Sequence, residues 1–87
     1  MKVKNGFILR RVGKQYVVAA TGEASKSFNG MMRLNSSGAY VFDLLKTEKT
    51  EEELIAALMA EYAVGESMAR ADVSVFISRL KEAGALV

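Results

Sequence analysis

The second half of the chain most constrains the fold, because three helix-forming segments follow one another, each with its own start signal. Asn35 or Ser36 is a natural N-cap for a first helix that runs to about residue 46. Thr50, with a glutamate three residues later, has the pattern of a capping box for a second helix. Ser67 is the expected cap of a third helix. The sequence therefore predicts three consecutive helices with short connections.

Apolar residues recur at helical spacing in all three segments, so each helix is expected to bury one face. The three predicted stripes are Val41, Phe42 and Leu45; Leu54, Ile55, Leu58, Met59 and Tyr62; and Ala69, Val73, Phe76, Leu80 and Ala83. Gly38 lies beside the first stripe and allows close backbone approach. Gly84 stands where a glycine that ends the third helix belongs.

The first part of the chain has the pattern of a sheet. Residues 7–12 and 15–20 are rich in β-branched and aromatic residues, and Gly13 begins a two-residue turn between them. The polar stretch 21–27 is expected to be a loop, and residues 28–34 a third short strand. The fold class is therefore α+β and winged-helix-like, with a three-stranded antiparallel sheet followed by three helices.

Length and composition exclude most enzyme chemistry. The 87 residues form one predicted domain, 1–87, without cysteine or histidine, so thiolate metal sites, thiol nucleophiles and the commonest general base are absent. The glycines form no phosphate-binding or dinucleotide motif. Glu48 and Glu51–Glu53 are the only dense acidic cluster, but consecutive helical positions point in different directions and do not converge on one ion. We expect no catalytic residue, no metal and no cofactor.

Charge is distributed unevenly along the chain. Residues 1–46 carry net charge +6 and residues 47–87 carry −4. A basic half can attract an anionic partner such as a nucleic acid or an acidic peptide, or it can simply be a solvated sheet surface. No segment is long and apolar enough for a membrane span, and no signal-peptide core follows Met1, so we expect a cytoplasmic protein without a membrane partner.

DNA binding is the main alternative function, because a winged-helix protein uses its third helix for recognition. That helix offers Arg70, Arg79 and Lys81 but no Asn or Gln for reading adenine, and its charge is largely balanced by acidic residues. We therefore do not expect nucleic acid as the partner. A small DNA-binding regulator or adaptor is kept as the alternative.

The order and spacing of the predicted caps and core positions resemble the PqqD-like family over nearly the whole chain. The residues that carry the resemblance are Leu34, Asn35, Gly38, Leu44, Leu45, Thr50, Glu52, Glu53, Leu54, Tyr62, Asp72, Val73, Phe76, Ile77, Leu80 and Gly84, preceded by the hairpin residues Gly6 to Arg10. The chain contains no proline, whereas the family members that serve pyrroloquinoline quinone synthesis have a proline-containing stretch before the Leu-Asn pair. The resemblance therefore does not identify the pathway.

The resemblance implies a stand-alone recognition element, a peptide chaperone for ribosomally made and modified peptides. In that family the leader segment of the precursor adds as a strand to the third β-strand and lies against the third helix. A modifying enzyme, often a radical SAM protein, then acts on the rest of the peptide. A homodimer formed through the same strand edge is an alternative use of that edge.

The residues predicted to bind the peptide lie on the third strand and the third helix. Period-two alternation places Met32 and Leu34 inward and Met31 and Arg33 outward on the strand. On the helix, one side of the buried stripe carries Met68, Asp72, Val75 and Arg79, and the opposite side carries Arg70, Ile77 and Lys81. The first side is the predicted wall of the binding cleft, Arg79 being suited to an acidic leader residue; the opposite side remains the alternative.

Overall fold

The computed structural model describes residues 1–26, 28 and 30–87. Three strands precede three helices: β1 (Phe7–Val12), β2 (Gln15–Ala20), a short 3-10 helix η1 (Gly22–Lys26), β3 (Met31–Leu34), α1 (Ser36–Leu44), α2 (Glu51–Tyr62) and α3 (Glu66–Glu82). This order confirms the predicted α+β class. Ser27 and Asn29 lie outside the described residues, together with the parts of the predicted loop and third strand that fall on them.

The sheet is antiparallel with the order β1-β2-β3, so β1 and β3 are its two edges. Gly13 has φ +63°, a conformation that glycine adopts without steric cost, and the two-residue turn joins β1 to β2 as predicted. β3 begins at Met31 rather than at Phe28 and is only four residues long. The 3-10 helix occupies most of the segment that the sequence predicted as a loop.

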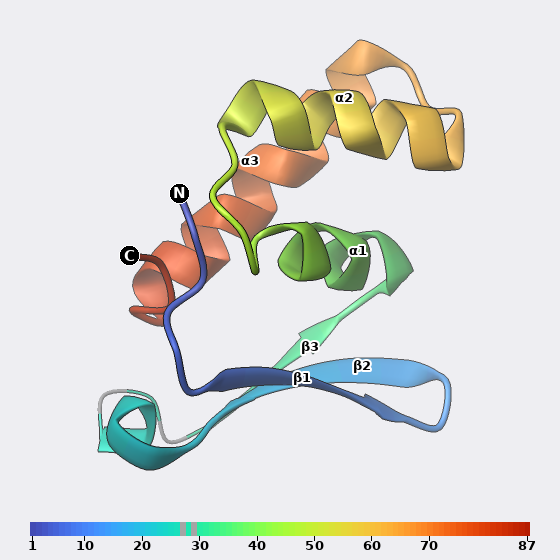
Figure 1. Ribbon diagram of the computed structural model, residues 1–87. Coiled ribbons are helices and arrows are strands. Elements are labelled where there is room, and N and C mark those ends of the chain that lie inside the picture. Colours follow the sequence, from blue (N-terminus) through green and yellow to red (C-terminus); the bar gives the residue numbers. More distant parts are fainter. Residues whose placement is uncertain (27, 29) are drawn as a thin grey trace.

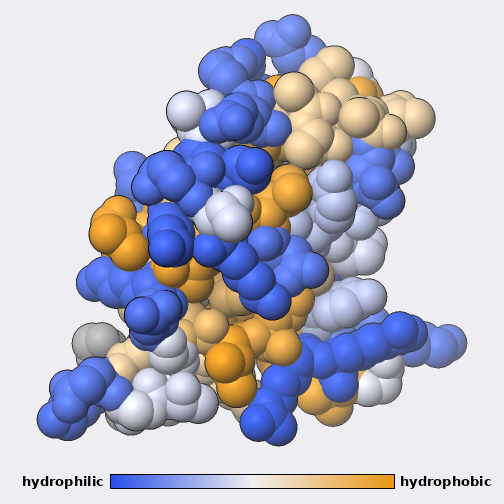
Figure 2. Space-filling model, in the orientation of Figure 1, coloured by the Kyte–Doolittle hydropathy of each residue, from blue (hydrophilic) through white to orange (hydrophobic). Residues whose placement is uncertain are grey.

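The helices lie on one face of the sheet: α1 lies next to the sheet, α2 lies on the far side of α1, and α3 slants from α2 down past α1 (Figure 1). The core lies between the sheet and the helices, and its most completely buried side chains are Val18, Val41, Phe42, Leu45, Leu54, Leu58, Val73 and Leu80. On the face shown in Figure 2, hydrophobic side chains gather where the helices meet the sheet, whereas the end of the hairpin is hydrophilic. The predicted helical stripes are thus confirmed for most positions, and Tyr62, with 38% of its surface exposed, is the main error.

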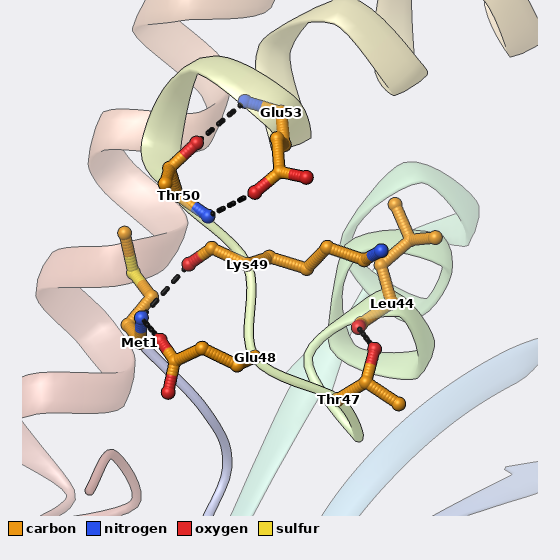
Figure 3. A network of polar contacts seen from close by, with 7 residues as sticks. All are labelled: Met1, Leu44, Thr47, Glu48, Lys49, Thr50 and Glu53. Atoms are coloured by element: carbon orange, nitrogen blue, oxygen red, sulfur yellow. Dashed lines mark hydrogen bonds and ion pairs between the residues drawn. The ribbon is translucent and has the colours of Figure 1, made fainter.

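Two of the three predicted helix starts are confirmed. Asn35 caps α1 by accepting a hydrogen bond from the Gly38 N–H at 2.8 Å. Thr50 and Glu53 form the predicted capping box, with distances of 3.1 and 2.9 Å (Figure 3). The prediction for α3 is wrong, because the helix begins at Glu66 with Gly65 as its N-cap and no side-chain cap.

The first residues of the chain are held between the α1–α2 connection and the C-terminal segment. The Met1 ammonium donates to the Glu48 carboxylate and to the Lys49 carbonyl, the latter at 2.8 Å (Figure 3). Val3 forms a bridge with Leu86, which brings the two ends of the chain side by side (Figure 1). Glu48 therefore has a structural partner.

Candidate functional site at the edge of β3

The register of the hairpin determines which backbone groups of β2 point toward β1. Val12 and Gln15 flank the two-residue turn and so exchange both of their backbone hydrogen bonds. In an antiparallel ladder the bonded pairs alternate, and Arg10 and Val17 form the next bonded pair. The N–H and C=O of Val17 are therefore used by β1.

The same alternation determines which backbone groups of β3 are free. Arg33 stands opposite Val17, whose backbone groups already bond to β1, so the N–H and C=O of Arg33 point away from β2. The same holds for Met31, two residues earlier, whereas Met32 and Leu34 make the bonds to β2. The free edge of β3 thus presents two outward N–H groups and two outward C=O groups.

Side chains on β3 alternate as the sequence predicts. Met32 and Leu34 are buried, and Met31 and Arg33 are exposed. Met31 keeps 71% of its surface exposed, which is a high fraction for an apolar side chain in a strand. β3 therefore has one face in the core, one face in solvent and one unpaired edge.

A pocket of about 190 Å³ lies between the end of β3, the start of α1 and one side of α3. Its lining is Leu34, Asn35, Ser37, Gly38, Val41, Leu58, Asp72, Val75, Phe76 and Arg79. Gly38 has a packing role here, because a Cβ at this position would lie 3.2 Å from the Asn35 Oδ1 and 3.3 Å from the Leu34 Cβ. The pocket thus joins an apolar floor to a rim of polar and charged groups.

A second, wider pocket of about 330 Å³ lies at the other end of β3. Its lining is Phe28, Met31, Met32, Arg33, Arg79, Glu82 and Ala83. The two pockets show that α3 runs antiparallel to β3, since the end of α3 lies beside the start of the strand. Neither pocket is lined by a β1 residue. The sheet edge that borders the two pockets is therefore β3 and not β1.

Arg79 connects the two sides of this groove. Its Nη2 donates a hydrogen bond of 2.8 Å to the Arg33 carbonyl oxygen, which is one of the outward acceptors of β3. Arg79 also lines both pockets. We define the β3-facing side of α3 by Asp72, Val75 and Arg79, which line the first pocket beside the buried Phe76.

The opposite side of α3 contacts α2. Arg70 donates to both oxygens of Glu52 on α2, at 2.8 and 3.3 Å, and to Glu66 at 3.1 Å. The Arg70 guanidinium lowers the pKa of the Glu52 carboxyl, first by hydrogen bonding and second by its charge. Ile77, which the sequence placed on the same side, is buried. We call this the α2-facing side of α3.

The acidic cluster at the start of α2 is accounted for by local contacts. Glu52 bonds to Arg70, and Glu53 accepts from the Thr50 backbone N–H, which is the largest cause of the lowered pKa of Glu53. Within the described residues, no group of three or more acidic side chains is placed to hold a metal ion. The described part of the chain also has no helix long and apolar enough to cross a membrane.

Comparison with known proteins gives the family. The family model of coenzyme PQQ synthesis protein D, PqqD, matches residues 8–86. The chain belongs to the PqqD family. This confirms the resemblance found in the sequence, and it covers all of the groove described above.

Two solved structures have a similar fold. The chain is 22% identical, with a TM-score of 0.75, to TbiB1 in a complex with the TbiA(beta) leader peptide, and the match covers 99% of this chain and 94% of that chain. It is 19% identical, with a TM-score of 0.71, to lasso peptide synthetase B1 complexed with the leader peptide, covering 97% and 93%. No curated protein matches the sequence significantly.

Seven of the eight predicted site residues of this PqqD family member lie around the groove. Leu34, Asp72, Val75 and Arg79 line the first pocket, and Met31, Met32, Arg33 and again Arg79 line the second. Met68 is 60% exposed and lines neither pocket.

Sequence reasoning missed several other residues of the groove. These are Phe28, Asn35, Ser37, Gly38, Val41, Leu58, Phe76, Glu82 and Ala83. The cap residue Asn35 gave a signal that could have been followed, because it directly continues β3. The contribution of Leu58 from α2 depends on tertiary packing and has no local signal.

Proposed function

We propose that this PqqD family member binds the leader segment of a ribosomally made precursor peptide as a fourth strand on the free edge of β3. The observation that carries the proposal is the outward row of backbone groups at Met31 and Arg33, bordered by the two pockets and by α3. An unpaired strand edge binds an extended peptide through backbone hydrogen bonds, and pockets beside it select side chains.

Alternation of side chains along the added strand gives the mode of recognition. Every second residue of the peptide would point toward α3 and the pockets, and the others would point toward solvent beside Met31 and Arg33. The first pocket, with Leu34, Val41 and Phe76 in its floor, suits an apolar leader side chain. The fold neighbours that were solved with their own leader peptides support this proposal.

We infer that the protein is a non-catalytic peptide chaperone that presents the precursor to a modifying enzyme. The sequence has neither His nor Cys, and three glutamates of the acidic cluster, Glu48, Glu52 and Glu53, have structural partners. The partner we propose is a radical SAM enzyme that acts in the cytoplasm on the part of the precursor outside the leader. Metal analysis of protein purified without added metal is expected to find no stoichiometric ion. A stoichiometric ion that disappears when Glu51–Glu53 are replaced would contradict this expectation.

The binding test uses synthetic peptides encoded by short open reading frames beside the gene. A leader peptide is expected to bind with micromolar affinity or better, and NMR chemical-shift changes are expected on residues 30–35 and the β3-facing side of α3. Shifts confined to α2 would contradict the proposed site. Specific binding of duplex DNA without leader binding would favour the regulator or adaptor, and dimerisation through β3 would appear as shifts that depend on protein concentration alone.

A further inference from the structure

The side chain of Arg79 occupies the position where an added strand would make one of its hydrogen bonds. Its guanidinium donates to the outward carbonyl of Arg33 at 2.8 Å. A fourth strand that continues past Arg33 needs the same carbonyl as an acceptor for a backbone N–H. Since Arg79 also lines both pockets, its side chain crosses the groove and separates the two hollows through which the peptide would run.

Arg79 differs from Arg70, the other arginine of α3, in its partners. Arg70 on the α2-facing side bonds to Glu52 and Glu66. Among the described residues, no Asp or Glu lies within 4.0 Å of the Arg79 guanidinium, and its hydrogen bond goes to a neutral carbonyl. A guanidinium binds a carboxylate more strongly than a carbonyl, through two parallel hydrogen bonds.

The acidic residues near Arg79 lie on either side of it along α3. Asp72 lines the first pocket but not the second, and Glu82 lines the second but not the first. Asp72 in the first pocket and Glu82 in the second disfavour a peptide carboxylate close to them, whereas Arg79 in both pockets and Arg33 in the second favour one. A carboxylate opposite Arg79 would meet the one cation that lines both pockets.

We propose that Arg79 closes the groove in the free protein and selects leaders that carry an Asp or Glu at the position facing it. This inference rests on the proposed function. The incoming strand takes the Arg33 carbonyl from Arg79, and the released guanidinium pairs with the leader carboxylate. A leader without that carboxylate leaves the guanidinium covered and unpaired, which is unfavourable, so Arg79 discriminates between leaders.

The first arm of the test uses the free protein and needs no peptide. In Arg79→Met, which retains an apolar stem but no donor, the ¹³C resonance of the Arg33 carbonyl is expected to move upfield, because its hydrogen bond is lost. In Arg70→Met the same resonance is expected to stay in place. An unchanged Arg33 resonance in Arg79→Met would overturn the proposed closure.

The second arm measures the affinity of the leader encoded beside the gene and of a version with every Asp and Glu replaced by the amide. Wild-type protein is expected to bind the acidic leader at least about tenfold more tightly than the amide version. In Arg79→Met the ratio of the two affinities should fall below about twofold. The amide version of the leader should bind Arg79→Met roughly threefold to tenfold more tightly than it binds the wild-type protein, because no side chain has to be displaced from the Arg33 carbonyl. Arg70→Met should retain the wild-type ratio.

The outcomes separate the two proposals. Binding of the leader with the same acid-to-amide ratio in wild type and Arg79→Met would overturn the selection by Arg79 and leave strand addition intact. Tight binding of a leader that contains no Asp or Glu would also overturn it. Failure of every leader to bind wild type, Arg79→Met and Arg70→Met alike would overturn the proposed function itself.

Discussion

The two sides of α3 use the same kinds of residue for different purposes. On the α2-facing side, Arg70 is held by two carboxylates and Ile77 is buried. On the β3-facing side, Val75 keeps 62% of its surface exposed and Arg79 bonds only to a backbone carbonyl at a strand edge. One side is completed by the chain itself and therefore contributes to stability. The other side keeps an exposed apolar side chain beside an arginine without a carboxylate partner, and this is the side that we propose to bind the leader.

The largest expected effect separates two adjacent residues of α3. Phe76 is 5% exposed, and Phe76→Ala should lower the free energy of unfolding by about 3–5 kcal/mol, because a large core side chain is lost. Val75→Ala should change it by less than about 0.5 kcal/mol but weaken leader binding. Chemical denaturation of both variants gives the comparison. A nearly neutral Phe76→Ala would show that α3 does not pack through this stripe.

A proline scan of β3 sharpens the assignment of the free edge. Met32→Pro removes an N–H that bonds to β2 and a buried side chain, so it should destabilise the protein by about 3 kcal/mol or more. Arg33→Pro removes an outward N–H and should leave the fold largely intact while weakening leader binding by about tenfold. Arg33→Ala controls for loss of the side chain. Equal destabilisation by the two prolines would contradict the assigned register.

The capping box at the start of α2, the helix that contacts the α2-facing side of α3, gives a smaller effect on stability. Thr50→Ala should lower the free energy of unfolding by roughly 0.5–2 kcal/mol, because the Glu53 N–H loses its acceptor. Leader affinity should not change, since Thr50 does not line the groove. Denaturant titration and a binding isotherm on the same preparation check both statements. Reduced leader affinity with unchanged stability would reverse the roles assigned to the two sides.

The smallest effect is the acid dependence of the contact between α2 and α3. Arg70 lowers the pKa of Glu52 below its ordinary value of 4.5 in the folded protein, so this contact stabilises the fold above that pH and is lost as the pH falls through the lowered pKa. Glu52→Gln should therefore make the decline in melting temperature below about pH 4.5 shallower. Leader binding at neutral pH should be unaffected. A variant as acid-sensitive as the wild type would show that the contact does not contribute.

Local signals in the sequence were sufficient for most of the fold. The Gly13 turn, the capping box at Thr50 and the alternation in β3 each depend on residues close in sequence, and each is confirmed. The predicted start of α3 was wrong: Ser67 is a good cap by residue type, but the helix is capped two residues earlier, at Gly65. Tyr62 was predicted buried but lies at the end of α2, where its hydroxyl donates to the Ser36 carbonyl.

The groove was predictable only in part. Alternation and helical spacing placed Leu34, Asp72, Val75 and Arg79 on surfaces that could meet, and the structure brings them to one pocket. Spacing alone could not decide between the two sides of α3, because that choice depends on how α2 packs and on the pairing of Arg70. The contact between Arg79 and the Arg33 carbonyl joins residues far apart in the sequence and has no local signature.

Amide hydrogen exchange on the leader-bound protein tests strand addition most directly, because the sheet has two free edges of which only one borders the groove. With saturating leader, the amides of Met31 and Arg33 should exchange at least about tenfold more slowly than in the free protein, since they become hydrogen-bonded to the peptide. The outward amides of β1, at Leu9 and Arg11, should exchange at unchanged rates. Protection at Leu9 and Arg11, or on α2, with none at Met31 and Arg33, would contradict binding at the edge of β3.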